Sequence, residues 1–113
     1  MSEINLDPDE DFLNARQLTA LIDRWLESLD VVEVTLTTYR GNIKHFSAWW
    51  SSEGPRREWR LTKTALIEFE IYLRGVTTKR FDAPLSYNSR YAIMRALRMM
   101  FKWAAATGRT SKN

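Results

Sequence analysis

Apolar residues recur at three- or four-residue steps in four separate stretches of the chain, which is the spacing that places side chains on one face of an α-helix. In order they are Leu18, Leu21, Ile22, Trp25 and Leu29; Tyr39, Ile43, Phe46 and Trp50; Leu66, Phe69 and Leu73; and Met94, Leu97, Phe101 and Ala104. No segment alternates apolar and polar residues as a half-buried strand would, and no segment repeats. The pattern predicts an all-α bundle of four helices.

Polar residues that can cap a helix stand before each periodic stretch. They are Asn14, Thr35, Thr62 and Ser86, all of types whose side chains accept a hydrogen bond from the first turn. Glycines follow three of the stretches, at Gly54, Gly75 and Gly108, as is typical of helix ends. We therefore expect helices over about residues 15–29, 35–52, 62–74 and 86–107.

The chain length of 113 residues suits a single domain with its own core. We place this domain at residues 14–108. Residues 1–13 are acidic and contain Pro8, so we expect a flexible lead there. Residues 109–113 form a short polar tail.

The sequence carries few groups for catalysis or metal binding. It has no cysteine and a single histidine, His45, which cannot build a usual zinc site; we expect it to be partly buried and hydrogen-bonded. Phosphate-binding loops, dinucleotide-binding glycines and nucleophile elbows are missing from the sequence. We expect neither enzymatic activity nor a cofactor. No signal peptide or membrane-spanning run is evident, which favours the cytoplasm.

Charge is distributed unevenly along the chain. The formal net charge is +3, but residues 1–33 carry two cations against nine carboxylates, whereas residues 34–113 carry fifteen cations against five. The second part therefore has a net charge of +10. This asymmetry indicates a basic working face preceded by an acidic segment.

The expected last helix separates its basic and apolar residues. At 100° per residue, a stripe roughly 80° wide lies opposite the apolar residues. This stripe contains Asn88, Tyr91, Arg95, Arg98 and Lys102. Arg90 falls toward the apolar side. Ser86 and Tyr87 stand at the beginning of the helix, where free backbone N–H groups favour a phosphate.

A similar stripe follows the expected second helix and contains Thr37, Arg40, Lys44 and Ser51. Arg40 and Lys44 are four residues apart, where two like charges repel each other unless an anion lies between them. Gly41 is unusual here, because a glycine costs about 1 kcal/mol relative to alanine in a helix interior. It could allow either a neighbouring helix or a ligand to come close.

Basic stripes that also contain Thr, Ser, Asn and Tyr are typical of surfaces that bind a nucleic-acid backbone. A membrane surface is disfavoured, because the apolar face of the last helix matches those of three other helices and should be buried. A helix-turn-helix repressor is disfavoured by the long connection over residues 76–85. Two other interpretations stay open. The domain could dock an acidic protein or a neighbouring protomer, or its cations could simply solvate the last helix.

Three stretches resemble the N-terminal core-binding domain of tyrosine recombinases, the phage-integrase family of site-specific DNA recombinases. They are Val34–Gly54, similar to the family's second helix; Leu61–Gly75, similar to the third; and Ser86–Gly108, similar to the fourth. In the first, Thr35, Tyr39, Ile43 and Phe46 have the family's typical spacing. In the last, the run from Ala96 through Arg98 to Phe101 follows the pattern A/S-L-R-x-x-F. The chain departs from the family at Ala65, where an acidic residue is common, and in its longer, more basic 76–85 loop.

The resemblance implies a SAM-like orthogonal four-helix bundle that forms half of a clamp around duplex DNA, with its second and fourth helices on the DNA. It implies as partners double-stranded DNA, a catalytic domain of the same parent chain and other protomers on the DNA. A phage or another mobile element would carry such a protein, and it would be associated with the nucleoid. Residues 109–113 would begin the linker to the catalytic domain. His45 begins His-Phe-Ser-Ala instead of the family's His-x-x-Arg, so no tyrosine here is expected to be the nucleophile.

The residues expected to contact DNA are Thr37, Arg40, Lys44, Ser86, Asn88, Tyr91, Arg95, Arg98 and Lys102, with Lys79, Arg80 and Tyr87 as supplementary contacts. The cations would neutralise phosphates. The polar residues would position the helices or touch base edges. No metal is expected.

Overall fold

The computed structural model describes residues 11–78 and 83–108, and these form an all-α bundle. The elements are β1 (Asp11–Phe12), α1 (Ala15–Ser28), α2 (Glu33–Glu53), the 3₁₀ turn η1 (Gly54–Arg57), β2 (Arg60–Leu61), α3 (Lys63–Leu73), β3 (Thr77–Thr78), β4 (Ala83–Pro84) and α4 (Tyr87–Ala106). The predicted fold class is confirmed. Each of the four helices lies within two residues of its expected bounds.

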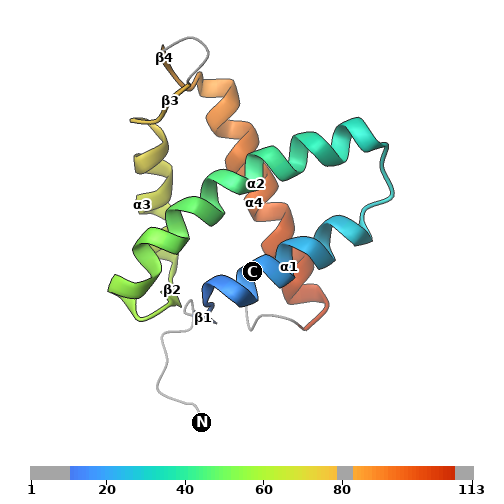
Figure 1. The fold of residues 1–113 in the computed structure, drawn as a ribbon, viewed down its shortest axis with the longest axis horizontal. Helices are drawn as coiled ribbons and strands as arrows, with labels where there is room; N and C mark the ends of the chain where they lie inside the picture. The colour runs from blue at the N-terminus through green and yellow to red at the C-terminus, as the bar shows by residue number, and fades with distance from the viewer. Residues whose placement is uncertain (1–10, 79–82, 109–113) are drawn as a thin grey trace.

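The helices form two crossing layers. In Figure 1, α1 and α2 lie on the near side, and α4 crosses behind both of them. α3 stands beside the first half of α4. Because α2 packs against both α1 and α4, it is the central helix of the bundle.

Side-chain caps set the beginning of three helices, as expected. Asn14 accepts a hydrogen bond from the backbone of Gln17, whose side chain in turn accepts from the Asn14 N–H, both at 2.8 Å. Thr62 and Ser86 cap α3 and α4 in the same way. The expected cap at Thr35 is wrong. α2 begins two residues earlier, after Val32 and without a side-chain cap. The carboxylate of Glu33 in its first turn interacts favourably with the positive end of the helix dipole.

The core is built around the ring of Phe46, which is fully buried in α2. Its ring lies edge-on to Phe69 of α3 and to Phe101 of α4, with centroid distances of 5.1 and 6.1 Å. It also stacks on Trp50 at 6.1 Å. One side chain therefore touches three helices, and edge-to-face pairs of this kind add about 0.5–1.5 kcal/mol beyond area burial.

The last three residues of the expected flexible lead belong to the folded part. β1 pairs with β2 in antiparallel register, Asp11 opposite Leu61 and Phe12 opposite Arg60. Leu13 is buried, and its carbonyl accepts a 2.6 Å hydrogen bond from Trp50 Nε1. The indole N–H needs a partner when it is buried, and the incoming chain supplies one. The predicted lead of residues 1–13 thus overlaps the domain at residues 11–13, and the remainder of it lies outside the described residues.

Two two-residue strand pairs occur where none was expected. Besides β1 with β2, β3 pairs with β4 with Thr77 opposite Pro84 and Thr78 opposite Ala83. A ladder of two residues is too short to show alternating hydrophobicity, so the sequence pattern could not reveal it.

A tight chain reversal after α2 depends on Gly54. Glu58 and Trp59 both have positive φ, 54° and 59°, a conformation that costs about 1–2 kcal/mol for each such residue. The Trp59 N–H donates to the Gly54 carbonyl at 2.8 Å, and the Trp59 carbonyl accepts from Leu13 N–H at 2.8 Å. These bonds hold the Trp59 ring directly over Gly54. The ring also packs edge-on against Trp50.

Arg57, in the same loop, has a structural role. Its guanidinium pairs with Glu53 of α2 and with Glu68 of α3 and lies 5.5 Å from the centre of the Trp49 ring. The charged loop at residues 56–60 therefore connects α2 to α3 through Arg57, so not all of its cations are available to a ligand.

We predict opposite effects of the same substitution at two glycines. A Cβ at Gly54 would lie 2.1 Å from two atoms of the Trp59 ring, whereas a Cβ at Gly41 meets nothing within 4 Å. Gly54→Ala should lower the free energy of unfolding by about 1–3 kcal/mol through overpacking. Gly41→Ala should raise it by about 0.5–1 kcal/mol through helix propensity. Urea unfolding followed by circular dichroism measures both, and equal effects would contradict the described packing of Trp59.

Candidate nucleic-acid interface

The residues expected on the basic face of α4 are all exposed. We define the α4 ridge as Tyr87, Asn88, Tyr91, Arg95, Arg98 and Lys102, each of which is exposed. The opposite side of α4 is buried from Ile93 to Ala104. All the residues that the helical wheel placed on one stripe of this helix therefore lie on its exposed face, and Tyr87 lies there with them.

No carboxylate neutralises the α4 ridge within the described part of the chain. α4 itself contains four cations and no acidic residue. Among residues 11–78 and 83–108, the ion pairs join arginines of the loop after α2 to Glu53, Glu58 and Glu68, and none involves Arg95, Arg98 or Lys102. Uncompensated cations along one helix face attract an anion of matching length.

An apolar groove runs beside the ridge, between α3 and α4. It has a volume of about 280 Å³ and is lined by Leu66, Met94, Leu97 and Phe101, with Arg98 and Lys102 at its edge. The sequence indicated an apolar stripe at these positions but not the groove itself. Met94, Leu97 and Phe101 are nearly inaccessible to solvent, whereas Leu66 of α3 is only partly buried.

The second stripe, on α2, is also exposed but has acidic neighbours. We define the α2 stripe as Thr37, Arg40, Lys44 and Ser51, all exposed. Arg40 and Lys44 border a groove between α1 and α2 that Asp23 also lines. Arg40 and Asp23 further line an adjoining hollow together with Glu27. Carboxylates of α1 therefore lower the positive potential around Arg40.

The two basic surfaces have different neighbouring helices. α2 and α4 pack together through their buried residues, and Figure 1 shows α2 crossing in front of α4. Arg40 and Lys44 of the α2 stripe border a groove with α1, whereas Arg98 and Lys102 of the α4 ridge line a groove with α3. The helical wheels of the isolated helices could not reveal these neighbours.

Several of the expected polar contacts already have intramolecular partners. The Ser86 hydroxyl accepts from the Ser89 backbone N–H at 3.1 Å as the cap of α4. The Thr37 hydroxyl donates to the Glu33 carbonyl at 3.1 Å. Asn88 is exposed, so its amide is better placed than the Ser86 and Thr37 hydroxyls to bind a base edge. The candidates Lys79 and Arg80 lie outside the described residues.

The beginning of α4 presents two exposed tyrosines side by side. The rings of Tyr87 and Tyr91 are nearly parallel, at 22°, with centroids 6.5 Å apart. The guanidinium of Arg90 lies 5.9 Å from the centre of the Tyr87 ring, and Arg90 Nε is buried without a hydrogen-bond partner in the described residues. Arg90 is partly buried as expected. The four-residue spacing of the two tyrosines was the sequence signal for this pair.

Gly41 lies on the exposed side of α2. No atom of the described residues lies within 4 Å of the position of its missing Cβ, so close packing of a neighbouring helix does not explain the glycine.

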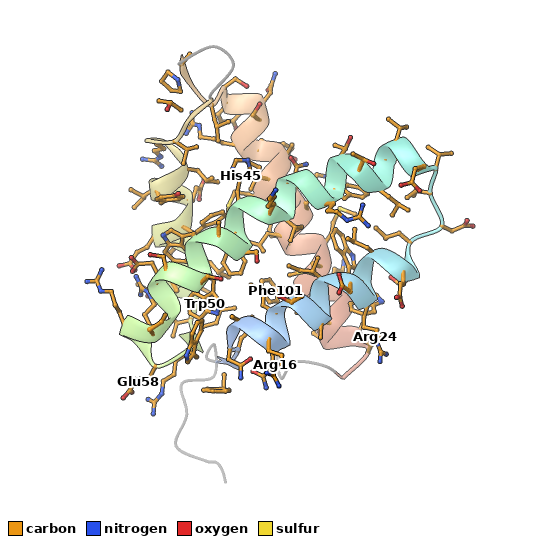
Figure 2. The ribbon with its side chains drawn as sticks, viewed as in Figure 1. Arg16, Arg24, His45, Trp50, Glu58 and Phe101 are labelled. Carbon is orange, nitrogen blue, oxygen red and sulfur yellow. The ribbon has the colours of Figure 1, made fainter. Side chains whose placement is uncertain are left out.

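His45 is partly buried, as expected, and burial lowers the pKa of its imidazole. The expected hydrogen bond stays a prediction, since the ring is partly open to solvent. No group of three or more His, Asp or Glu side chains in the described ranges could hold a metal ion. Figure 2 shows His45 on α2.

Comparisons with protein-family models, with curated proteins and with solved structures give no match. The resemblance to tyrosine recombinases therefore depends on the sequence motifs of the second, third and fourth helices. Within the described residues, none of the helices has the length and hydrophobicity that a membrane span requires.

We predict a pH dependence of stability that comes from His45. Because its pKa is lower in the folded protein than the ordinary 6.5, the unfolded chain binds more protons between these two values, and stability falls as the pH drops through that window. Urea unfolding should show this loss as the pH falls below about 6.5. His45→Gln should remove it while leaving stability at higher pH nearly unchanged. An unaltered pH profile in this variant would assign the loss to other groups.

Proposed function

We propose that the chain is a DNA-binding module of the core-binding type from a site-specific tyrosine recombinase, with duplex DNA as its ligand and the α4 ridge as its principal contact. The observation that carries the proposal is the uncompensated row of Arg95, Arg98 and Lys102 on the exposed face of α4. The motifs of the second, third and fourth helices support the family. Catalysis would come from another domain of the parent protein.

The dimensions of the ridge suit a DNA strand. Arg95 and Lys102 are seven residues apart, about 10 Å along the helix axis, so their cations can reach more than one phosphate of the same strand. Asn88 and Tyr91 continue the same face toward the start of the helix. The cations would fix the position of the backbone, and Asn88 would reach a base edge in a groove.

The α2 stripe is a secondary surface in this proposal. Its cations are exposed, but Asp23 and Glu27 of α1 lie near Arg40. The open space at Gly41 would let a DNA backbone approach α2 closely.

A second candidate function follows from the groove between α3 and α4. Its apolar lining and the cations Arg98 and Lys102 at its edge suit an acidic amphipathic segment of another protein or of a neighbouring protomer. Amide shifts on adding duplex DNA separate the two. Changes along the whole α4 ridge support DNA, and no changes there with duplex favour the protein partner.

We predict that Arg95→Ala/Arg98→Ala weakens duplex binding and reduces its salt dependence. Removing two phosphate contacts should lower the slope of log affinity against log salt by about 2. Fluorescence anisotropy with a labelled duplex over a series of salt concentrations measures both quantities.

Arg16→Ala/Arg24→Ala is the matched control, since it removes the same charge from two exposed residues of α1, which Figure 2 shows in the near layer. If the α4 variant and the α1 variant lower the slope equally, binding follows net charge and the assignment of the α4 ridge is wrong.

We also predict a ranking of the two basic surfaces. Arg40→Ala/Lys44→Ala should reduce duplex affinity less than Arg95→Ala/Arg98→Ala, because carboxylates of α1 already offset the charge near Arg40. The same anisotropy titration at a fixed salt concentration compares them. A larger loss from the α2 variant would make the α2 stripe the principal contact.

A further inference from the structure

Tyr87 and Tyr91 expose more aromatic surface than a helix needs for stability. Their exposed fractions are 71% and 52%, although burying a tyrosine is normally favourable. Single exposed residues are ordinary, but contiguous exposed apolar patches mark interaction sites, and these two rings are neighbours. Both rings lie on the α4 ridge, beside its cations.

The two rings already lie close together in the unbound protein. The Tyr91 ring and the Arg90 guanidinium lie beside Tyr87, with centroid distances of 6.5 and 5.9 Å. Arg90 is partly buried, which restricts its movement. Side chains that are ordered before binding lose less conformational entropy when a ligand stacks on them.

The shape of these side chains indicates which part of DNA they would bind. In a paired duplex the faces of the bases are covered by neighbouring bases, and only their edges are open in the grooves. An unpaired base offers a face, and aromatic side chains bind such faces with little sequence preference. Arg95 and Arg98 follow Tyr91 by about 6 and 10 Å along the axis, so the adjoining phosphates can reach them.

We infer that the Tyr87–Tyr91 pair stacks on an unpaired DNA base, so that the domain prefers DNA with a locally unpaired base to fully paired duplex. This inference rests on the proposed DNA binding of the α4 ridge. The ridge cations hold the backbone next to the unpaired base, and the tyrosine rings receive the base itself.

The test compares two labelled DNA molecules that differ in one nucleotide. One is a fully paired duplex, and the other is the same duplex with a single extra, unpaired base in the middle of one strand. Anisotropy titrations at one salt concentration give the ratio of their affinities. The protein should bind the DNA with the unpaired base at least about fivefold more tightly than the fully paired duplex. This is the ratio that about 1 kcal/mol of stacking produces.

Three variants assign the preference to the rings. Tyr87→Ala/Tyr91→Ala should bring the ratio close to one, and Tyr87→Phe/Tyr91→Phe should keep it, because the rings and not the hydroxyls make the contact. Phe12→Ala is the matched control. It removes an exposed aromatic ring, 59% exposed, from β1, which Figure 1 shows far from the beginning of α4. Circular dichroism confirms that each variant is folded.

The possible results separate this inference from the proposed function. Salt-dependent duplex binding with a ratio of one in the unaltered protein overturns the inference alone. A preference that persists in Tyr87→Ala/Tyr91→Ala also overturns it and assigns the effect to the flexibility of the interrupted duplex. Absence of salt-dependent binding to either DNA overturns both proposals. A ratio above fivefold that the Ala variant loses and the Phe variant keeps supports the inference.

Discussion

The packing of Phe46 is the constraint on which the other features of this domain depend. Its ring touches aromatic side chains of α2, α3 and α4 and is inaccessible to solvent. Because the ring makes edge-to-face contacts with Phe69 and Phe101, the sides of α3 and α4 that carry these residues face the core. The rotation of α4 in turn decides which of its residues face outward, so the core determines the composition of the candidate interface.

The orientation of the helices gives the two basic surfaces different electrostatic environments. α2 shares its exposed flank with α1, which carries Asp23 and Glu27 next to Arg40. α4 shares its flank with α3 through apolar residues. Cations that have no carboxylate nearby keep their full potential for an anionic ligand. An anionic ligand should therefore be attracted more strongly to α4 than to α2.

The parts of the fold that depend on local sequence could be predicted. Asn14, Thr62 and Ser86 cap helices as their side-chain chemistry indicates, and the exposed and buried faces of α4 follow its periodicity. Features that depend on distant residues could not be predicted. The docking of Leu13 requires the Trp50 indole 37 positions along the chain, and the left-handed pair Glu58–Trp59 is set by what surrounds it.

In the candidate site, too, the features that depend on one helix could be predicted, and those that depend on neighbouring helices could not. The wheel identified the exposed residues of each stripe correctly, because exposure within a helix follows from its own sequence. It could not show which helix borders each stripe, because that depends on how the helices pack. The open groove beside Arg98 and the carboxylates near Arg40 likewise come from neighbouring helices. Helix packing, and not helix formation, is the step that sequence periodicity leaves undetermined.

The distribution of aromatic residues has a practical optical consequence. Trp25, Trp49 and Trp50 are buried, and Trp59 and Trp103 pack against the core, whereas the only aromatic residues of the α4 ridge are tyrosines. Indole emission therefore reports the integrity of the core, and phenol emission includes a contribution from the ridge. Excitation at the long-wavelength edge of the absorption band selects the indoles alone, so unfolding of the core can be followed without a contribution from the ridge tyrosines and without attaching a dye.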